Sequence, residues 1–115
     1  MIQKGVTNVD SRIEIGWLFD FYGPLLSARQ SELLTMWCEE DMSLSEIAEA
    51  TGVSRQSVSS VLHMAQDHLK NYEEKLGLLA RHRRLTNGLE QCLKLLETDP
   101  VQARDLIKQL LSEEE

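Results

Sequence analysis

The chain has 115 residues, of which 42% are hydrophobic and 27% are charged, and its formal net charge is −7. These values are typical of one small folded domain, and they exclude an enzyme with a catalytic cleft between two lobes. The acidic balance also argues against a protein that coats nucleic acid by charge alone, because Lys and Arg supply the nonspecific affinity for phosphates.

Positive charge is concentrated in one segment. Residues 51–84 carry six Lys or Arg against three Asp or Glu, whereas residues 1–50 carry three against nine, and residues 85–115 carry three against seven. Cys38 and Cys92 lie far apart, without the spacing of a zinc site, so we expect two buried thiols and no metal. No apolar run reaches the roughly 18 residues that span a bilayer, and no signal peptide is recognisable, so we expect a cytoplasmic protein without a membrane partner.

The first predicted elements are two helices. Residues 1–9 lack a periodic apolar pattern and are predicted to form a flexible tail, with a helix-turn-helix domain over residues 10–84. Ile13, Trp17 and Phe21 recur every four residues, with Leu18 beside them, and predict the broad apolar face of a helix that ends at Gly23-Pro24.

A capping box of Ser27 and Gln30 then predicts the start of a second helix. Its apolar side is formed by Leu33, Leu34, Trp37 and Cys38. The helix ends in the acidic residues 39–41, which oppose the helix dipole and suggest a surface for a partner.

Residues 42–62 have the pattern of a helix-turn-helix. Ser43 and Glu46 form a second capping box, which predicts a short helix over residues 44–51. Gly52 follows where the chain must turn with a positive φ, and Ser54 can cap the next helix. In such a motif the second helix enters the major groove.

The beginning of that second helix is therefore the predicted DNA-binding site. Arg can bind guanine through two acceptors, Gln can do the same with adenine, and Ser can contact phosphate or base edges. The candidate residues are Ser54, Arg55, Gln56, Ser59, Ser60 and His63. Alternatively, Ser54 is only a helix cap, and Arg55 and Gln56 are ordinary solvated residues.

A long apolar stripe continues from this helix, with spacings of three and four residues as far as Leu79. It predicts one long helix, and its second half could form a coiled-coil seam with another subunit. The residues of that predicted dimer seam are Leu69, Tyr72, Leu76 and Leu79. The alternative is that the stripe packs on the N-terminal helices of its own chain.

A basic cluster follows the stripe and could reach DNA phosphates or an acidic partner, although a solvated helix end is the commoner meaning of such a run. Its residues are Lys75, Arg81, Arg83 and Arg84, with His82 among them. Residues 85–115 are predicted to form a C-terminal extension of two helices, the last capped by Asp99 with Pro100 at its first position. The predicted fold class is all-α.

No catalytic pattern is present. His63 and His68 lie five residues apart, a spacing that does not bring two imidazoles onto one helical face. The sequence has no phosphate-binding glycine loop and no nucleophile motif, so we expect no enzyme activity, no cofactor and no small-molecule substrate.

Several separated motifs together resemble the YlxM family, helix-turn-helix proteins encoded beside signal recognition particle genes in Gram-positive bacteria. They are W-L-F-D-F-Y at 17–22, L-L-S-A-R-Q at 25–30, S-L-S-E-I-A-E at 43–49, V-S-R-Q at 53–56 and Y-E-E-K-L at 72–76. The resemblance covers Trp17 to Leu79. It implies a core similar to the promoter-reading C-terminal domain of sigma factors, with an extended recognition helix, a homodimer, and a role linked to the signal recognition particle.

The chain departs from that family pattern after V-S-R-Q. Where the family continues with Ala-Val-Tyr-Asp and a later Lys-Arg pair, this sequence reads Ser57-Val58-Ser59-Ser60 and His63-Met64. Fewer basic residues are thus available for phosphates. Two hypotheses follow: a DNA-binding regulator, or a protein-interaction module that binds a component of the protein-targeting machinery. RNA is a further potential target.

Overall fold

The computed structural model describes the backbone of residues 4–114 and the side chains of residues 11–114. Over these residues it contains six α-helices, two short helical turns and no strand, which confirms the predicted all-α class. The chain divides into two compact units, residues 1–77 and 78–115. The predicted boundary after Arg84 therefore differs from the observed division, which falls at a glycine between two helices.

Helix α1 spans Lys4–Tyr22 and is followed by the 3₁₀ turn η1, Gly23–Leu25, at the predicted Gly-Pro break. The helix includes residues 4–9, where a tail was expected, and residues 1–3 lie outside the described residues. Each residue added to an existing helix gains a backbone hydrogen bond, so a helix can extend past its apolar stripe.

The buried stripe of α1 shares only Leu18 with the predicted apolar face. Ile15, Leu18 and Tyr22 are at most 3% exposed, whereas Ile13 and Trp17 are 50% and 46% exposed. Both sets have helical spacing, and the position of the neighbouring helices decides which set faces the core.

Helix α2, Ala28–Leu34, begins with the predicted capping box, in which Ser27 and Gln30 exchange two hydrogen bonds. It continues into a π-helical turn, η2, at Thr35–Glu39. Leu33 and Leu34 are fully buried. Asp41 then takes a positive φ of 56°, which turns the chain away from η2 towards the next helix.

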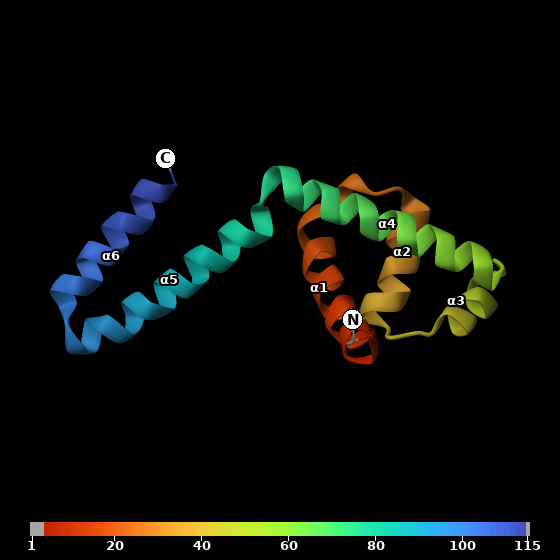
Figure 1. Cartoon of the computed structure of the whole chain (residues 1–115), viewed down its shortest axis with the longest axis horizontal. Coiled ribbons are helices and arrows are strands. Elements are labelled where there is room, and N and C mark those ends of the chain that lie inside the picture. The colour runs from red at the N-terminus through yellow and green to blue at the C-terminus, as the bar shows by residue number, and fades with distance from the viewer. Residues whose placement is uncertain (1–3, 115) are drawn as a thin grey trace. The chain divides into compact units, whose positions relative to one another are not determined.

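Helix α3, Leu44–Thr51, and helix α4, Arg55–Leu76, form the helix-turn-helix. Figure 1 shows α4 in green beside α1, α2 and α3, all of which contact it. The core of this first unit is formed by fully or nearly fully buried side chains: Ile15, Leu18, Tyr22, Leu33, Leu34, Ile47, Val58, Leu62, Ala65 and Leu69. The apolar stripe of α4 as far as Leu69 thus packs on the chain's own helices, as the alternative interpretation held.

Gly77 ends α4 in the left-handed conformation, with φ 63° and its N–H donating to the Glu73 carbonyl. The single long helix predicted through Leu79 is therefore wrong, because a glycine at this position closes a helix without a Cβ clash. Helix α5, Leu78–Thr98, and helix α6, Pro100–Glu113, form the second unit. Asp99 caps α6 as predicted, accepting from the Gln102 N–H.

The α5–α6 hairpin has its own small seam. Cys92, Ala103 and Leu110 are buried there, and Gly88 allows close approach of the two helices. A Cβ added at Gly88 would lie 2.7 Å from a methyl group of Leu110. Figure 1 shows the two helices side by side over most of the length of α6.

Candidate nucleic-acid interface

Local hydrogen bonds fix the start of both helices of the motif. The Ser43 Oγ accepts from the Glu46 N–H at 3.1 Å, and the Glu46 carboxylate accepts from the Ser43 N–H at 2.8 Å. Gly52 ends α3 with φ 74°, in open space where a side chain would strain only the backbone. These contacts hold α3 and α4 on either side of a tight turn.

The cap of α4 gives Ser54 a structural role. Its Oγ accepts from the Ser57 N–H at 3.1 Å, as in the alternative interpretation of this residue. Its hydroxyl hydrogen remains able to donate, so a phosphate contact stays a prediction.

Helix α4 is buried on one side only. Val58, Leu62, Ala65 and Leu69 point into the core at helical spacing. On the other side, Gln56, Ser60 and His63 are all exposed, and their spacing of four and three residues places them on one face. This outward stripe contains three of the six predicted DNA-binding residues.

Arg55 and Ser59 lie on the shoulder of that stripe. Arg55 is exposed, and within residues 11–114 it makes no ion pair, so its guanidinium is available to a ligand. Ser59 is half-buried, and its carbonyl oxygen lies 3.2 Å from His63 Nδ1. That contact orients the His63 ring along the helix.

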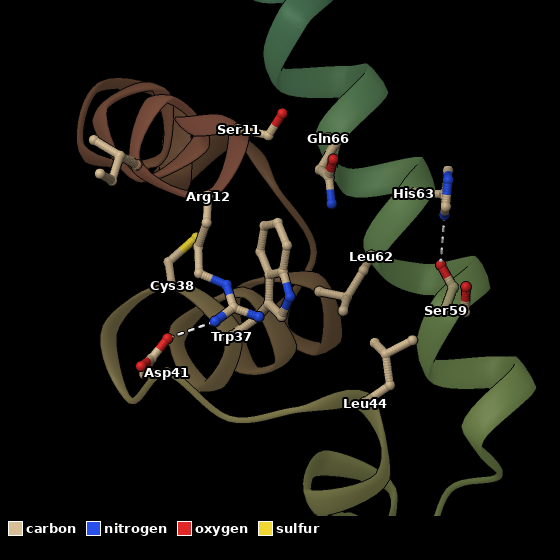
Figure 2. Close-up of a pocket in the computed structure, with 11 residues that line it drawn as sticks. Ser11, Arg12, Trp37, Cys38, Asp41, Leu44, Ser59, Leu62, His63 and Gln66 are labelled. Carbon is tan, nitrogen blue, oxygen red and sulfur yellow. Dashed lines mark hydrogen bonds and ion pairs between the residues drawn. The ribbon is translucent and has the colours of Figure 1, made fainter. Parts of the chain in front are cut away.

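A groove of about 810 Å³ runs beside this shoulder, between the side chains of α1, η2, the start of α3 and α4. Its lining includes Ser59, His63 and Gln66 of α4, together with Arg12, Trp37 and Asp41. Figure 2 shows Leu62 and Gln66 on the side of α4 that is nearer to Trp37. The Arg12 guanidinium carbon lies 4.7 Å from the Trp37 ring centroid, and its Nη1 lies 2.5 Å from the Asp41 carboxylate. This cation is therefore already neutralised and covered.

No pattern in the sequence indicates this groove. Arg12 and Asp41 are 29 positions apart, and only the packing of α1 against η2 brings them together. Cys38 also lines the groove, and its partial burial raises the pKa of its thiol to about 11, despite the opposing effect of Arg12. This shift favours the protonated thiol over the nucleophilic thiolate at neutral pH.

Acidic side chains are exposed on both helices of the helix-turn-helix. Glu46 and Glu49 are exposed on α3, and Asp67 follows His63 on the outward side of α4. Arg55 is an exposed basic residue at the start of α4. A duplex lying along α4 would therefore find few positive partners for its phosphates.

The residues of the predicted basic cluster belong to two different units of the chain. Lys75 is exposed in the last turn of α4, whereas Arg81, Arg83 and Arg84 belong to the second unit. Arg81 Nε donates to the Glu114 carboxylate at 2.6 Å, and Arg84 Nε lies 3.7 Å from the Glu113 carboxylate. The hydrogen bond and the charge of Glu114 raise the pKa of Arg81.

The four residues of the predicted dimer seam are also divided. Leu69 is fully buried in the first unit and Leu79 is 5% exposed in the second, so neither side chain is available to a partner. Tyr72 is half-buried, with its ring 5.8 Å from the Tyr22 ring. Of the four, only Leu76 is strongly exposed, at 58%.

The described residues contain no cluster of three or more His, Cys, Asp or Glu side chains able to hold a metal. The His68 ring stacks on the Tyr72 ring with a centroid distance of 6.3 Å, whereas His63 contacts the Ser59 carbonyl oxygen, so the two histidines have different partners. Within residues 4–114 no helix has the length and apolar character to cross a membrane.

Comparison with known proteins confirms the resemblance found in the sequence. The model of the UPF0122 family, described as "Putative helix-turn-helix protein, YlxM / p13 like", matches residues 9–113 and so extends beyond Leu79 into the second unit. A UPF0122 protein of Symbiobacterium thermophilum is 46% identical over 83 residues, which cover 72% of this chain and 78% of the relative.

Two further relatives agree. A UPF0122 protein of Thermoanaerobacter sp. is 42% identical over 88 residues, covering 76% of this chain and 75% of the relative. One of Halalkalibacterium halodurans is 39% identical over 83 residues, covering 72% and 76%. The chain therefore belongs to the UPF0122 family of YlxM-like helix-turn-helix proteins.

Proposed function

We propose that this chain is a non-catalytic, cytoplasmic DNA-binding protein that places the first half of α4 in the major groove. The observation that carries the proposal is the outward stripe of Gln56, Ser60 and His63, which is exposed while the opposite side of the helix is in the core. This is the arrangement that a recognition helix requires.

The stripe offers hydrogen-bonding groups rather than charge. The Gln56 amide can bind the N6 and N7 of adenine, and Arg55 at the helix start can bind the O6 and N7 of guanine. Ser60 and His63 can each contact a base edge or a phosphate oxygen. We propose Gln56 and Arg55 as the base-reading residues.

The charge of the protein bears on the binding mode. With a net charge of −7 and with Arg81 and Arg84 in ion pairs, few cations are free to neutralise phosphates. Such a protein should bind nonspecific DNA weakly and with a shallow salt dependence. Homodimerisation would then add affinity by presenting two α4 helices to paired half-sites, as expected of a regulator of transcription.

The test is a titration of fluorescent duplex from the upstream region of the protein's own operon, against a scrambled duplex, at two salt concentrations. Gln56→Ala should lose about 1–3 kcal/mol of discrimination at one base pair. Asn71→Ala, on the same helix beyond the stripe, is the matched control and should bind as the wild type does. The proposal is overturned if neither duplex binds at micromolar protein, or if Gln56→Ala weakens both duplexes equally.

A second function is favoured by the acidic surface. Glu39, Glu40, Glu46 and Glu49 are exposed on the first unit. The resemblance to YlxM suggests a basic component of the signal recognition particle pathway as the partner of this surface. In that case purified components should bind the wild type and Arg55→Ala equally, and Glu39→Gln with Glu40→Gln should weaken binding, more so at low salt.

A further inference from the structure

The α5–α6 hairpin carries a large apolar surface on one side. On α5, Leu89, Leu93 and Leu96 are 57%, 67% and 52% exposed, and on α6, Ile107 and Leu111 are 38% and 65% exposed. Scattered exposed leucines need no explanation in a soluble protein, but a continuous apolar face does.

Helical geometry shows that these residues share one side of the hairpin. The helix seam is formed by residues 88, 92 and 95 of α5 and residues 103, 106 and 110 of α6, all buried or half-buried. Each exposed apolar residue comes one position after a seam residue, so it lies about 100° further round its helix. Because the two helices run antiparallel, the same rotation leads to the same side of the pair.

The opposite side of the hairpin is polar. The residues one position before the seam residues are Asn87, Gln91, Lys94, Gln102, Asp105 and Gln109, and all of them are exposed. The hairpin is thus amphipathic across its two faces, and nothing in its own unit covers the apolar one. Units below about 40 residues ordinarily need a disulfide, a metal or association to fold. Cys92 is a free thiol, and the described residues offer no metal site.

We propose that this apolar face pairs with the same face of a second copy of the chain, forming a four-helix bundle around a two-fold axis. The distribution of charged residues around the apolar face indicates that its partner is a second copy of the chain. Glu90 and Glu97 border the face on α5, and Arg104 and Lys108 lie in or beside it on α6. Within residues 11–114, none of these four side chains has an ion-pair partner.

The contacts between α5 and α6 fix where these charged residues lie along the length of the hairpin. Cys92 lies beside the Ala103 carbonyl, and Gly88 lies beside Leu110, so Glu90 is level with residues between Arg104 and Lys108. If α5 packs on the partner's α6, each Glu90 faces the partner's Arg104 and Lys108, and the pair is formed twice. If α5 packs instead on the partner's α5, glutamates face glutamates. The first arrangement is therefore the one that the charges favour.

The inference deepens the proposed function, since it supplies the dimer that would present two α4 helices, but it is tested without DNA. Sedimentation velocity of the full chain between roughly 1 and 100 µM should show a monomer–dimer equilibrium. Leu89→Glu with Leu93→Glu should raise the dissociation constant by about 100-fold or more, because buried charges would lack partners. Gln91→Glu, which adds a carboxylate to the polar face, is the matched control and should dimerise as the wild type does.

Charge reversal tests the arrangement without touching the leucines. Glu90→Lys alone, and Arg104→Glu with Lys108→Glu alone, should each weaken self-association by about tenfold, since each homodimer then has two repulsive sites. A mixture of the two variants should form a heterodimer of near wild-type affinity. Helical circular dichroism should be the same for all of them.

A wild type that stays monomeric throughout this range overturns the proposal, as does a Glu90→Lys homodimer that is as tight as the wild type. Duplex binding distinguishes the two proposals. Loss of sequence preference in Gln56→Ala with an intact dimer supports both, whereas a dimer that binds no DNA leaves this inference standing and removes the proposed function.

Discussion

The Tyr22 hydroxyl donates a hydrogen bond to the Glu73 carboxylate at 2.6 Å, joining the end of α1 to the last turns of α4. Tyr22 is 1% exposed, so its hydroxyl would be costly to leave without a partner. We predict that Tyr22→Phe lowers the free energy of unfolding by about 1–3 kcal/mol, because the acceptor is charged. Urea denaturation followed by circular dichroism measures the change.

Tyr72→Phe is the control for that substitution. The Tyr72 hydroxyl is 3.5 Å from the Leu25 carbonyl oxygen, at the limit of a hydrogen bond, and its residue is only half-buried. Its removal should change the free energy of unfolding by less than about 0.5 kcal/mol. Equal effects of the two substitutions would contradict the role given to Tyr22.

The helix ends of this protein could be predicted from the sequence because each depends on groups a few residues apart. The capping boxes at Ser27 and Ser43 and the caps at Ser54 and Asp99 all form as their spacing indicates. The left-handed Gly52 follows from the same local rules. The outward stripe of α4 also lay within the predicted set, since the first turns of a recognition helix face the duplex.

Features that depend on packing could not be predicted in this way. Whether Ile13 or Ile15 faces the core is decided by α4 and η2, which the spacing within α1 does not describe. The apolar periodicity continues across Gly77 and so does not reveal that the helix ends there. The spacing of apolar residues carries no information about the left-handed backbone at this glycine. The ion pair of Arg12 with Asp41 depends on the packing of α1 against η2 and on the left-handed backbone at Asp41.

Two glycines in helices should respond oppositely to alanine. Apart from its chain neighbours and the backbone of its own helix, a Cβ added at Gly16 would have no atom within 4 Å, so Gly16→Ala should stabilise the first unit by about 0.5–1 kcal/mol through helix propensity. At Gly88 the new Cβ would lie 2.7 and 2.8 Å from both methyl groups of Leu110, so rotating that side chain gives little relief. Gly88→Ala should therefore destabilise the second unit by about 1–3 kcal/mol.

Hydrogen exchange of the amides in α5 and α6, at one fixed protein concentration, measures the Gly88→Ala effect in the unit where it acts. Urea denaturation of the Gly16→Ala variant measures the other. A Gly88→Ala protein with slower exchange in α5 would show that the hairpin tolerates a wider separation of its helices.

The Cys38 thiol should lose its proton at an unusually high pH. Burial raises the pKa of its thiol from 9.0 to about 11, so the folded protein keeps the proton at pH values where the unfolded chain has lost it. The contribution of Cys38 to stability is thus intact below about pH 9, and it is lost as the pH rises towards 11. In a Cys92→Ser background, ultraviolet absorbance of the thiolate should give a midpoint near 11 when folded. The same protein in urea should titrate near the ordinary thiol value, and a folded midpoint at or below that value would contradict the prediction.

The ion pairs of the C-terminal hairpin should limit its affinity for nucleic acid. Arg81 and Arg84 are held by Glu114 and Glu113, and replacing both carboxylates by Gln frees two guanidinium groups. If these arginines contact phosphates in the complex, as predicted from the sequence, Glu113→Gln with Glu114→Gln should tighten duplex binding and steepen its logarithmic salt dependence by about one to two units. The matched control is Glu39→Gln with Glu40→Gln, which removes the same charge from exposed positions in the other unit. Equal gains in both double variants would mean that net charge alone is responsible, and no gain in either would place Arg81 and Arg84 outside the interface.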